Sequence, residues 1–230
     1  MSSIMSIAEQ ILYEDNHLIA LNKLPGQIVQ GDKTGDTPLV EEIKAFLKMR
    51  DNKPGNVFCG VIHRLDRPVS GVVIFAKTSK ALSRMTSLVL HRQFQKTYLA
   101  VVKNRPPCEE GHLEDYLFRV EKSNKSFVTS DPQKPGAKLA VLDYRLKAVS
   151  SGGYHLLEVD LHTGRHHQIR CQLANMGCPI KGDLKYGASR SNPDGSISLH
   201  SYRLVFEHPV RHEQVTITAP SPWTYFNTEL

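Results

Sequence analysis

Four ionisable residues in one short segment have the types and spacing of a reactive site. His63, Arg64, Asp66 and Arg67 lie in HRLDRPVSG, between the apolar runs GVI and GVVIFA. Those runs predict two buried strands. An acid flanked by arginines where two such strands meet has two interpretations. It closes a salt-bridged turn, or it is a reactive carboxylate at the floor of a cleft.

A second segment, HTGRHHQIR (162–170), places Arg165 at the start of a helix predicted over 165–176. The positive end of a helix dipole disfavours a cation at that place. We therefore expect either an anion opposite Arg165 or a side chain that points into water. Asp66 is the expected anion, because both residues lie where a predicted strand runs into a turn.

Basic residues gather in the segment that follows Asp66. Between Arg67 and Cys108 the chain has eight Lys and Arg residues and no Asp or Glu, whereas the whole chain has a net charge of +6. A segment whose charges are all positive favours a polyanionic partner, and the alternative is a basic face without a partner. The charges are spread over a predicted helix and its flanking strands, which makes a membrane surface the less favoured partner.

The elements that must position these residues alternate between short strands and a few helices. In the segment 17–29, a strand is predicted that ends at the turn Pro25–Gly26. Further strands are predicted on both sides of Asp66, over 96–102 and 154–161, as a pair between 117 and 146, and over 199–209 and 214–220. Helices are predicted over 37–49, with Thr37 as N-cap, over about 79–92 and over 165–176. Since many strands connect through turns, the pattern predicts an α+β fold with a mixed but mostly antiparallel sheet and no clear domain boundary.

Composition excludes several classes of protein. The 40% hydrophobic and 23% charged content is typical of a soluble globular chain. No apolar run approaches the ~20 residues of a membrane span, and the N-terminal segment has neither a secretory nor an Arg-rich transit pattern. The four cysteines lack CxxC spacing and indicate reduced thiols, so we expect a cytoplasmic protein.

Three motifs in order resemble the RluA-type RNA pseudouridine synthases. HRLDRPVSG (63–71) resembles the family's catalytic motif, KTYLAVV (96–102) its second motif and GRHHQIR (164–170) its third. GCPIKGDLKYG (177–187) and LHSYRLVFEHP (199–209) match further family segments. The resemblance covers about residues 12–222. Two positions depart from the family pattern, Val69 and His166, each of which replaces a Thr.

The resemblance implies a fold, a bent sheet flanked by helices with a basic cleft, and a reaction. Uridine in RNA is isomerised to pseudouridine: the bond from ribose C1′ to uracil N1 breaks, the base turns, and C5 joins C1′. No redox change and no external group are involved, so no cofactor is expected. A metal site at His162, His166 and His167 is disfavoured because Arg165 lies between them.

Three residues match the family's catalytic positions. Asp66 is expected to be the essential carboxylate, which either attacks C1′ or promotes elimination to a glycal. Burial alone would raise the pKa of such an acid, and a nearby Arg165 would favour its charged form. Tyr98 is expected to stack on the target base. The alternative is that its ring only packs in the core. Arg64 is expected either to replace the extruded uridine in the RNA stack or to pair with Asp66.

Several basic residues complete the expected RNA contacts. They are Arg64, Arg67, Lys77, Lys80, Arg84 and Lys96, with His63 beside them as an orienting hydrogen-bond partner. The expected partner is a tRNA or rRNA stem-loop, bound by a monomeric single catalytic domain over 1–230 without an S4-type RNA-binding domain. Two other classes of function stay open: a non-catalytic RNA-binding or RNA-folding factor, and a metal-dependent hydrolase, which Arg165 disfavours.

Overall fold

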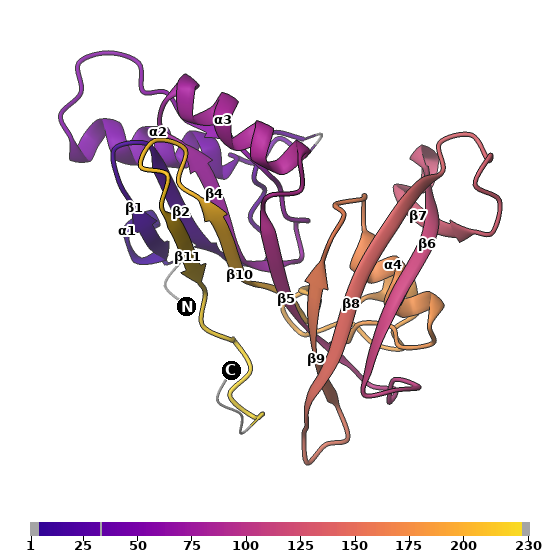
Figure 1. The fold of residues 1–230 in the computed structure, drawn as a ribbon. Coiled ribbons are helices and arrows are strands. Elements are labelled where there is room, and N and C mark those ends of the chain that lie inside the picture. The colour runs from indigo at the N-terminus through magenta and orange to yellow at the C-terminus, as the bar shows by residue number, and fades with distance from the viewer. Residues whose placement is uncertain (1–4, 33, 227–230) are drawn as a thin grey trace. The chain divides into compact units, whose positions relative to one another are not determined.

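The computed structural model describes residues 5–32 and 34–226 and divides them into two compact units (Figure 1). Unit 1 contains the described residues up to Phe94 together with Ser201–Pro220. Unit 2 contains Gln95–His200 and the described residues from Ser221 onward. None of the helices in the described part of the chain is long and apolar enough to cross a membrane.

Unit 1 is built on a sheet whose central strands are buried on both faces. β1 (Ile11–Glu14) pairs with β2 (Leu18–Lys23), and β2 pairs with β4 (Ser70–Ala76) in the register Lys23↔Gly71. The two-residue β3 (Gly60–Val61) also pairs with β4. β10 (Leu199–Glu207) lies next to β4, and β11 (Gln214–Thr218) pairs with β10. All seven residues of β4 are buried, as its run of apolar residues predicts.

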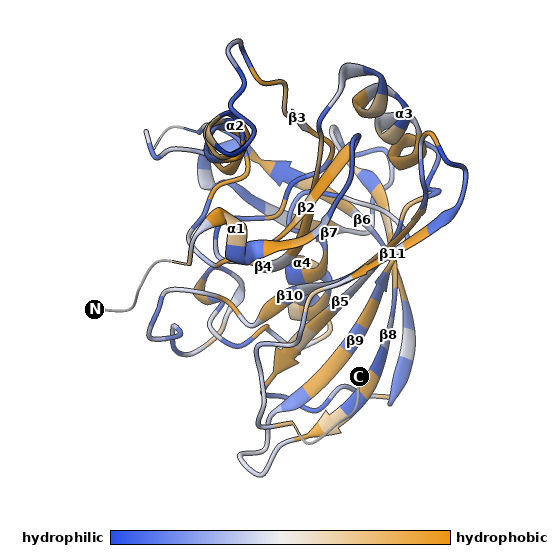
Figure 2. Cartoon of the chain, turned by 90° about the vertical axis from the view of Figure 1, so that its left-hand side faces the viewer, coloured by the Kyte–Doolittle hydropathy of each residue, from blue (hydrophilic) through white to orange (hydrophobic). Residues whose placement is uncertain are grey.

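Helices cover this sheet. α3 (Ser79–Leu90) begins after Thr78, whose side chain accepts the Ala81 amide, and it buries Ala81 and Met85 against β2, β4, β10 and β11. α2 (Leu39–Arg50) buries four apolar residues and lies on the other side of the strands from α3 (Figure 2). A short α1 (Ile7–Gln10) precedes β1.

Unit 2 is a second antiparallel arrangement of strands. Its order is β5 (Gln95–Val102), β9 (His155–Leu161), β8 (Lys138–Val149), β6 (Glu110–Val120) and β7 (Lys125–Thr129). Every one of these pairings is antiparallel. Buried residues recur at every second position through the first half of β8, which is the pattern of a strand with one face on a core. α4 (Gln168–Asn175) packs near β7 and β6.

The α+β class and the mostly antiparallel pairing are confirmed, and several predicted boundaries are wrong. α2 has Pro38 rather than Thr37 as its N-cap residue, because Leu39 N–H donates to Ile28. α4 begins at Gln168 rather than at residue 165, since His167 has a left-handed backbone with φ 53°. The predicted pair of strands between 117 and 146 is three strands, with an unpredicted turn through 3-10 residues Glu121–Ser123 between β6 and β7.

Gly71, the last residue of HRLDRPVSG, offers a test of the packing in unit 1. Its φ is +108°, and a Cβ there would overlap the carbonyl oxygen of Ser201 and lie 2.6 Å from the Ser201 amide nitrogen. We expect Gly71→Ala to lower the free energy of unfolding by about 2–4 kcal/mol in urea denaturation. Gly55→Ala is the matched control, because a Cβ at Gly55 meets nothing within 4 Å. Equal stabilities of the two variants would contradict this packing.

Candidate functional site

The segment between β3 and β4 presents Asp66 above an apolar base. Ile62, Leu65 and Val69 are buried, whereas Arg64 is exposed and Asp66 is half-buried. The Val69 amide donates to the Asp66 carbonyl at 3.0 Å and closes a turn whose central residues are Arg67 and Pro68. Buried side chains thus anchor the loop on both sides of the carboxylate, as is required of a group that must be held in one place.

A buried lysine holds this loop from below. Lys23, the last residue of β2, has no exposed surface, and its Nζ donates to the carbonyls of Leu24 at 3.1 Å, Arg67 at 3.1 Å and Val69 at 2.6 Å. We call these three bonds the Lys23 clasp. Burial lowers the pKa of Lys23 to about 7; the negative charge of Asp66 opposes this shift, and Arg67 adds to it. Sequence reasoning missed Lys23, although a lysine that ends the apolar run HLIALNK was a usable signal.

A backbone hydrogen bond also joins the loop after β2 to the carbonyl of Arg67. The Gly26 amide donates to the Arg67 carbonyl at 2.8 Å, so this oxygen accepts from both Gly26 and Lys23. Gly26 itself has φ +89°, a conformation that favours glycine at the tip of the turn. The backbone that follows Asp66 is therefore fixed by two donors from a distant part of the sequence.

In unit 2, Arg165 lies in the turn between β9 and α4 rather than inside the helix. Its Nε donates to the Leu139 carbonyl at 2.7 Å. Gln168 Oε1 accepts from the Arg165 amide at 3.0 Å and from the Thr163 hydroxyl at 2.8 Å. The glutamine of GRHHQIR therefore folds the turn, and the Leu139 carbonyl helps to aim the guanidinium.

The same turn is fixed to the GCPIKGDLKYG segment by a buried ion pair. Arg170 Nε and Nη2 bind the two carboxylate oxygens of Asp183 at 2.6 and 2.9 Å, and both side chains are buried. Such bidentate pairs are geometrically specific, and the loss of one partner leaves an uncompensated buried charge. Tyr186 lies under this pair: its hydroxyl accepts from the Ser126 amide at 2.8 Å, and burial raises its pKa to about 12.

Tyr98 lies in β5 opposite Val159 of β9. The neighbouring Thr97 donates through its hydroxyl to Asp160 at 2.8 Å, which fixes the strand pair at this place. Lys96 reaches the third motif, since its Nζ lies 3.4 Å from where a Cβ on Gly164 would be, and burial lowers its pKa. The second and third motifs thus lie close together within unit 2, and Asp66 belongs to unit 1.

Comparisons with known proteins decide the family. The family model described as RNA pseudouridylate synthase matches residues 17–175. The tRNA pseudouridine synthase C of Pasteurella multocida is 33% identical, over 91% of this chain and 90% of the relative. This chain belongs to the RNA pseudouridylate synthase family. The predicted RluA-type resemblance is confirmed, and membership makes the chain an isomerase that forms pseudouridine in RNA.

Two further relatives agree with this membership. The ribosomal large subunit pseudouridine synthase C of Rickettsia bellii is 31% identical over 95% of this chain and 70% of its own length. The solved structure of human RNA Pseudouridylate Synthase Domain Containing 4 is 23% identical, covers 95% of this chain and 91% of the human chain, and has a TM-score of 0.78. That likeness shows the fold of the pseudouridylate synthases.

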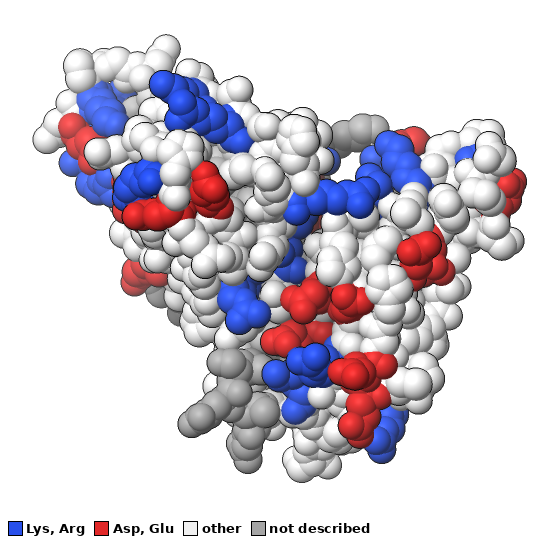
Figure 3. All heavy atoms as spheres, in the orientation of Figure 1, with Lys and Arg blue, Asp and Glu red and all other residues white. Residues whose placement is uncertain are grey.

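Acidic residues from elsewhere in unit 1 form ion pairs with two of the basic residues in the segment from Arg67 to Cys108, which itself has no Asp or Glu. Arg67 pairs with Asp36 at 2.6 Å, and the ammonium of Lys77 binds Glu14 at 2.6 Å. Lys77 is only 13% exposed, so an RNA contact would have to displace the Glu14 pair. Figure 3 accordingly shows Lys and Arg interspersed with Asp and Glu on the face in view.

The other predicted RNA-binding residues differ in exposure and in the hydrogen bonds that their side chains form within the protein. Arg64 and Lys80 are exposed, and Arg84 donates to the Pro209 carbonyl at 2.6 Å. His63 is half-buried against Phe94, and its Nε2 accepts the Ile74 amide at 3.3 Å, as an orienting residue would. RNA binding by this set stays a prediction.

The two residues that depart from the family pattern, Val69 and His166, both fit their surroundings in the structure. The Val69 side chain is buried, so a valine suits the apolar base of the Asp66 loop. His166 Nδ1 lies 2.9 Å from the Ser126 hydroxyl, which donates to the His166 carbonyl at 2.7 Å. His162 instead binds Asp143 at 2.6 Å, and His167 binds Tyr186 at 3.0 Å. His162, His166 and His167 therefore bind three different residues.

Replacement of Lys23 tests the clasp. We expect Lys23→Met to lower the free energy of unfolding by about 1–3 kcal/mol at pH 6, because buried carbonyls lose their donor. The wild type should gain stability between pH 7 and 9. Its Lys23 has a pKa of about 7 when folded and an ordinary one of about 10.4 when unfolded, so the unfolded chain binds more protons across this window.

Urea denaturation at pH 6, 7, 8 and 9 measures both effects. Lys23→Met should lack the gain between pH 7 and 9, and Lys44→Met is the control, since Lys44 only pairs with Glu41 on the surface of α2. The same gain in Lys23→Met and in the wild type would rule out Lys23 as its source.

Proposed function

We propose that this chain isomerises specific uridines in structured RNA, a tRNA or rRNA stem-loop, with Asp66 as the catalytic carboxylate. The observation that carries the proposal is the loop of HRLDRPVSG, in which buried residues, the Lys23 clasp and the Gly26 amide fix the backbone around a half-buried acid. The names of the Pasteurella and Rickettsia relatives support tRNA and rRNA as substrate classes.

Asp66 acts in its ionised form in this proposal. It attacks C1′ of the target uridine, or it promotes elimination to a glycal, and either route breaks the bond from C1′ to N1. The base then turns and C5 joins C1′; C5 loses a proton and N1 gains one, so the composition of the RNA is unchanged. The target must leave its stack first, because C1′ and C5 are otherwise out of reach.

Two residues of unit 2 complete the proposed machinery. Arg165 is the second proposed catalytic residue, and its own position is supported by Leu139 and Gln168. Tyr98 holds the uracil face, and its hydroxyl assists the loss of the C5 proton. Arg64 is exposed and takes either proposed role, in the RNA stack or beside Asp66. We also propose that the enzyme acts as a monomer and in the cytoplasm.

Asp66→Asn tests this assignment. The variant keeps the shape of the side chain and removes its charge, so we expect a loss of isomerisation of about 1,000-fold or more, with urea stability and RNA binding nearly intact. Tritium release from RNA labelled at C5 of uridine measures turnover. Asp131→Asn, at an exposed position between β7 and β8, is the control for a carboxylate outside the proposed site. Turnover near the wild-type rate in Asp66→Asn would leave an RNA-binding factor, or another catalytic residue, as the explanation.

A further inference from the structure

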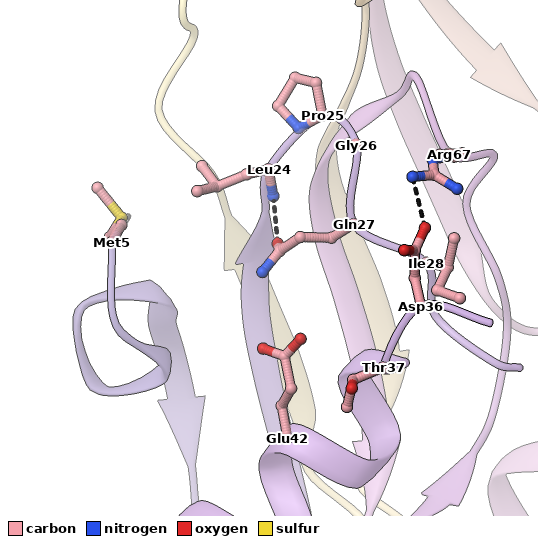
Figure 4. Close-up of a pocket in the computed structure, with 10 residues that line it drawn as sticks. All are labelled: Met5, Leu24, Pro25, Gly26, Gln27, Ile28, Asp36, Thr37, Glu42 and Arg67. Carbon is pink, nitrogen blue, oxygen red and sulfur yellow. Dashed lines mark hydrogen bonds and ion pairs between the residues drawn. The ribbon is translucent and has the colours of Figure 1, made fainter. Parts of the chain in front are cut away.

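Unit 1 contains a cavity beside the Asp66 loop that the reaction itself does not use. It has a volume of about 720 Å³ and lies between the turn after β2, the start of α2 and Arg67 (Figure 4). The Gly26 amide, which donates to the Arg67 carbonyl, joins the wall of this cavity to the residue that follows Asp66. A ligand in the cavity therefore lies next to the proposed catalytic loop.

One wall of the cavity carries an acid without a partner. The Glu42 carboxylate points from α2 into the cavity, and it forms no hydrogen bond or ion pair with another residue in the part of the chain that the structure describes (Figure 4). Burial raises its pKa. The adjacent Glu41 is different, since it pairs with Lys44 at 2.8 Å. A carboxylate that has lost part of its water without gaining a donor is a place where a ligand donor is stabilising.

The opposite wall carries an amide whose orientation is fixed. Gln27 Oε1 accepts the Leu24 amide at 2.8 Å, which leaves the NH₂ group of Gln27 in the cavity, facing Glu42 (Figure 4). The cavity therefore offers a donor group and a carboxylate acceptor side by side. Leu24, Ile28 and Met5 supply apolar surface around them.

This set of groups matches one RNA base better than the other three. The Watson–Crick edge of guanine presents an acceptor, O6, beside two adjacent donors, N1–H and the 2-amino group. Gln27 can donate to O6 while the Glu42 carboxylate accepts from both donors. Uracil has a single donor between two acceptors, and cytosine and adenine place an acceptor next to their only amino group, so none of them gives a carboxylate two donors.

We propose that this cavity binds a guanine base that is extruded from the RNA near the target uridine, and so helps to select the site of modification. The proposal rests on the proposed function, because it takes structured RNA as the substrate. Sequence-specific recognition of RNA commonly reads such splayed bases by their edges and packs side chains against their faces. Arg67, at the rim and 45% exposed, is then placed to contact a phosphate in exchange for Asp36.

A randomised stem-loop library tests the proposal through activity. After incubation with the enzyme, pseudouridines are mapped together with their flanking nucleotides. The wild type and Glu41→Ala should enrich guanine at one flanking position. Glu42→Ala should lose this enrichment and modify guanine-containing substrates about tenfold or more slowly. Inosine at that position, which lacks the 2-amino group, should slow the wild type and leave Glu42→Ala unaffected. No flanking preference for guanine, or the same preference in Glu42→Ala, would overturn the proposal.

Binding without catalysis separates this inference from the proposed function. In NMR titrations of the intact protein, guanosine monophosphate should shift the side-chain amide signals of Gln27, whereas adenosine monophosphate should not. Glu42→Ala should lose the response and Glu41→Ala should keep it. A shift in a protein that modifies no RNA would retain the guanine site and reject the enzyme. Equal responses to both nucleotides in an active enzyme would reject the guanine site alone.

Discussion

The Lys23 clasp is the interaction on which the candidate site depends. A fully buried ammonium requires acceptors, and this one has three backbone carbonyls, two of which, from Arg67 and Val69, belong to the turn that begins at Asp66. The loop cannot move away without leaving the buried Nζ of Lys23 and buried carbonyls unpaired. The sheet of unit 1 serves this arrangement, since the pairing of β2 with β4 brings Lys23 opposite Gly71, at the end of the same motif.

The sequence singled out candidate site residues, whereas it did not single out the residues that hold them in place. HRLDRPVSG and GRHHQIR pointed to Asp66 and Arg165 because acids and arginines at strand ends are unusual. Lys23, Gln168 and the Arg170–Asp183 pair were not singled out, since their roles depend on contacts across 13 to 46 positions of the chain or on a turn geometry that no local pattern encodes. The predicted place of Arg165, at the start of a helix, was wrong, because the residue precedes α4.

Strands with a strong apolar pattern were predictable, and their partners were not. The run GVVIFA predicted β4 correctly, and the helix predicted over about 79–92 is α3, Ser79–Leu90. The β6–β7 turn was missed because Asn124, in a left-handed conformation, closes it without glycine or proline. The basic segment from Arg67 to Cys108 is likewise less positive than its sequence suggests, because Glu14 and Asp36 pair with Lys77 and Arg67 from distant parts of the chain.

Family membership assigns the reaction, and Asp66 is the group that we propose performs it. A map of pseudouridines in total cellular RNA tests this directly when the codon for Asp66 is changed to Asn in the native gene. The account predicts that one or a few uridines lose their modification completely while the variant protein accumulates to the normal level. An unchanged map in cells that depend on the variant would contradict it.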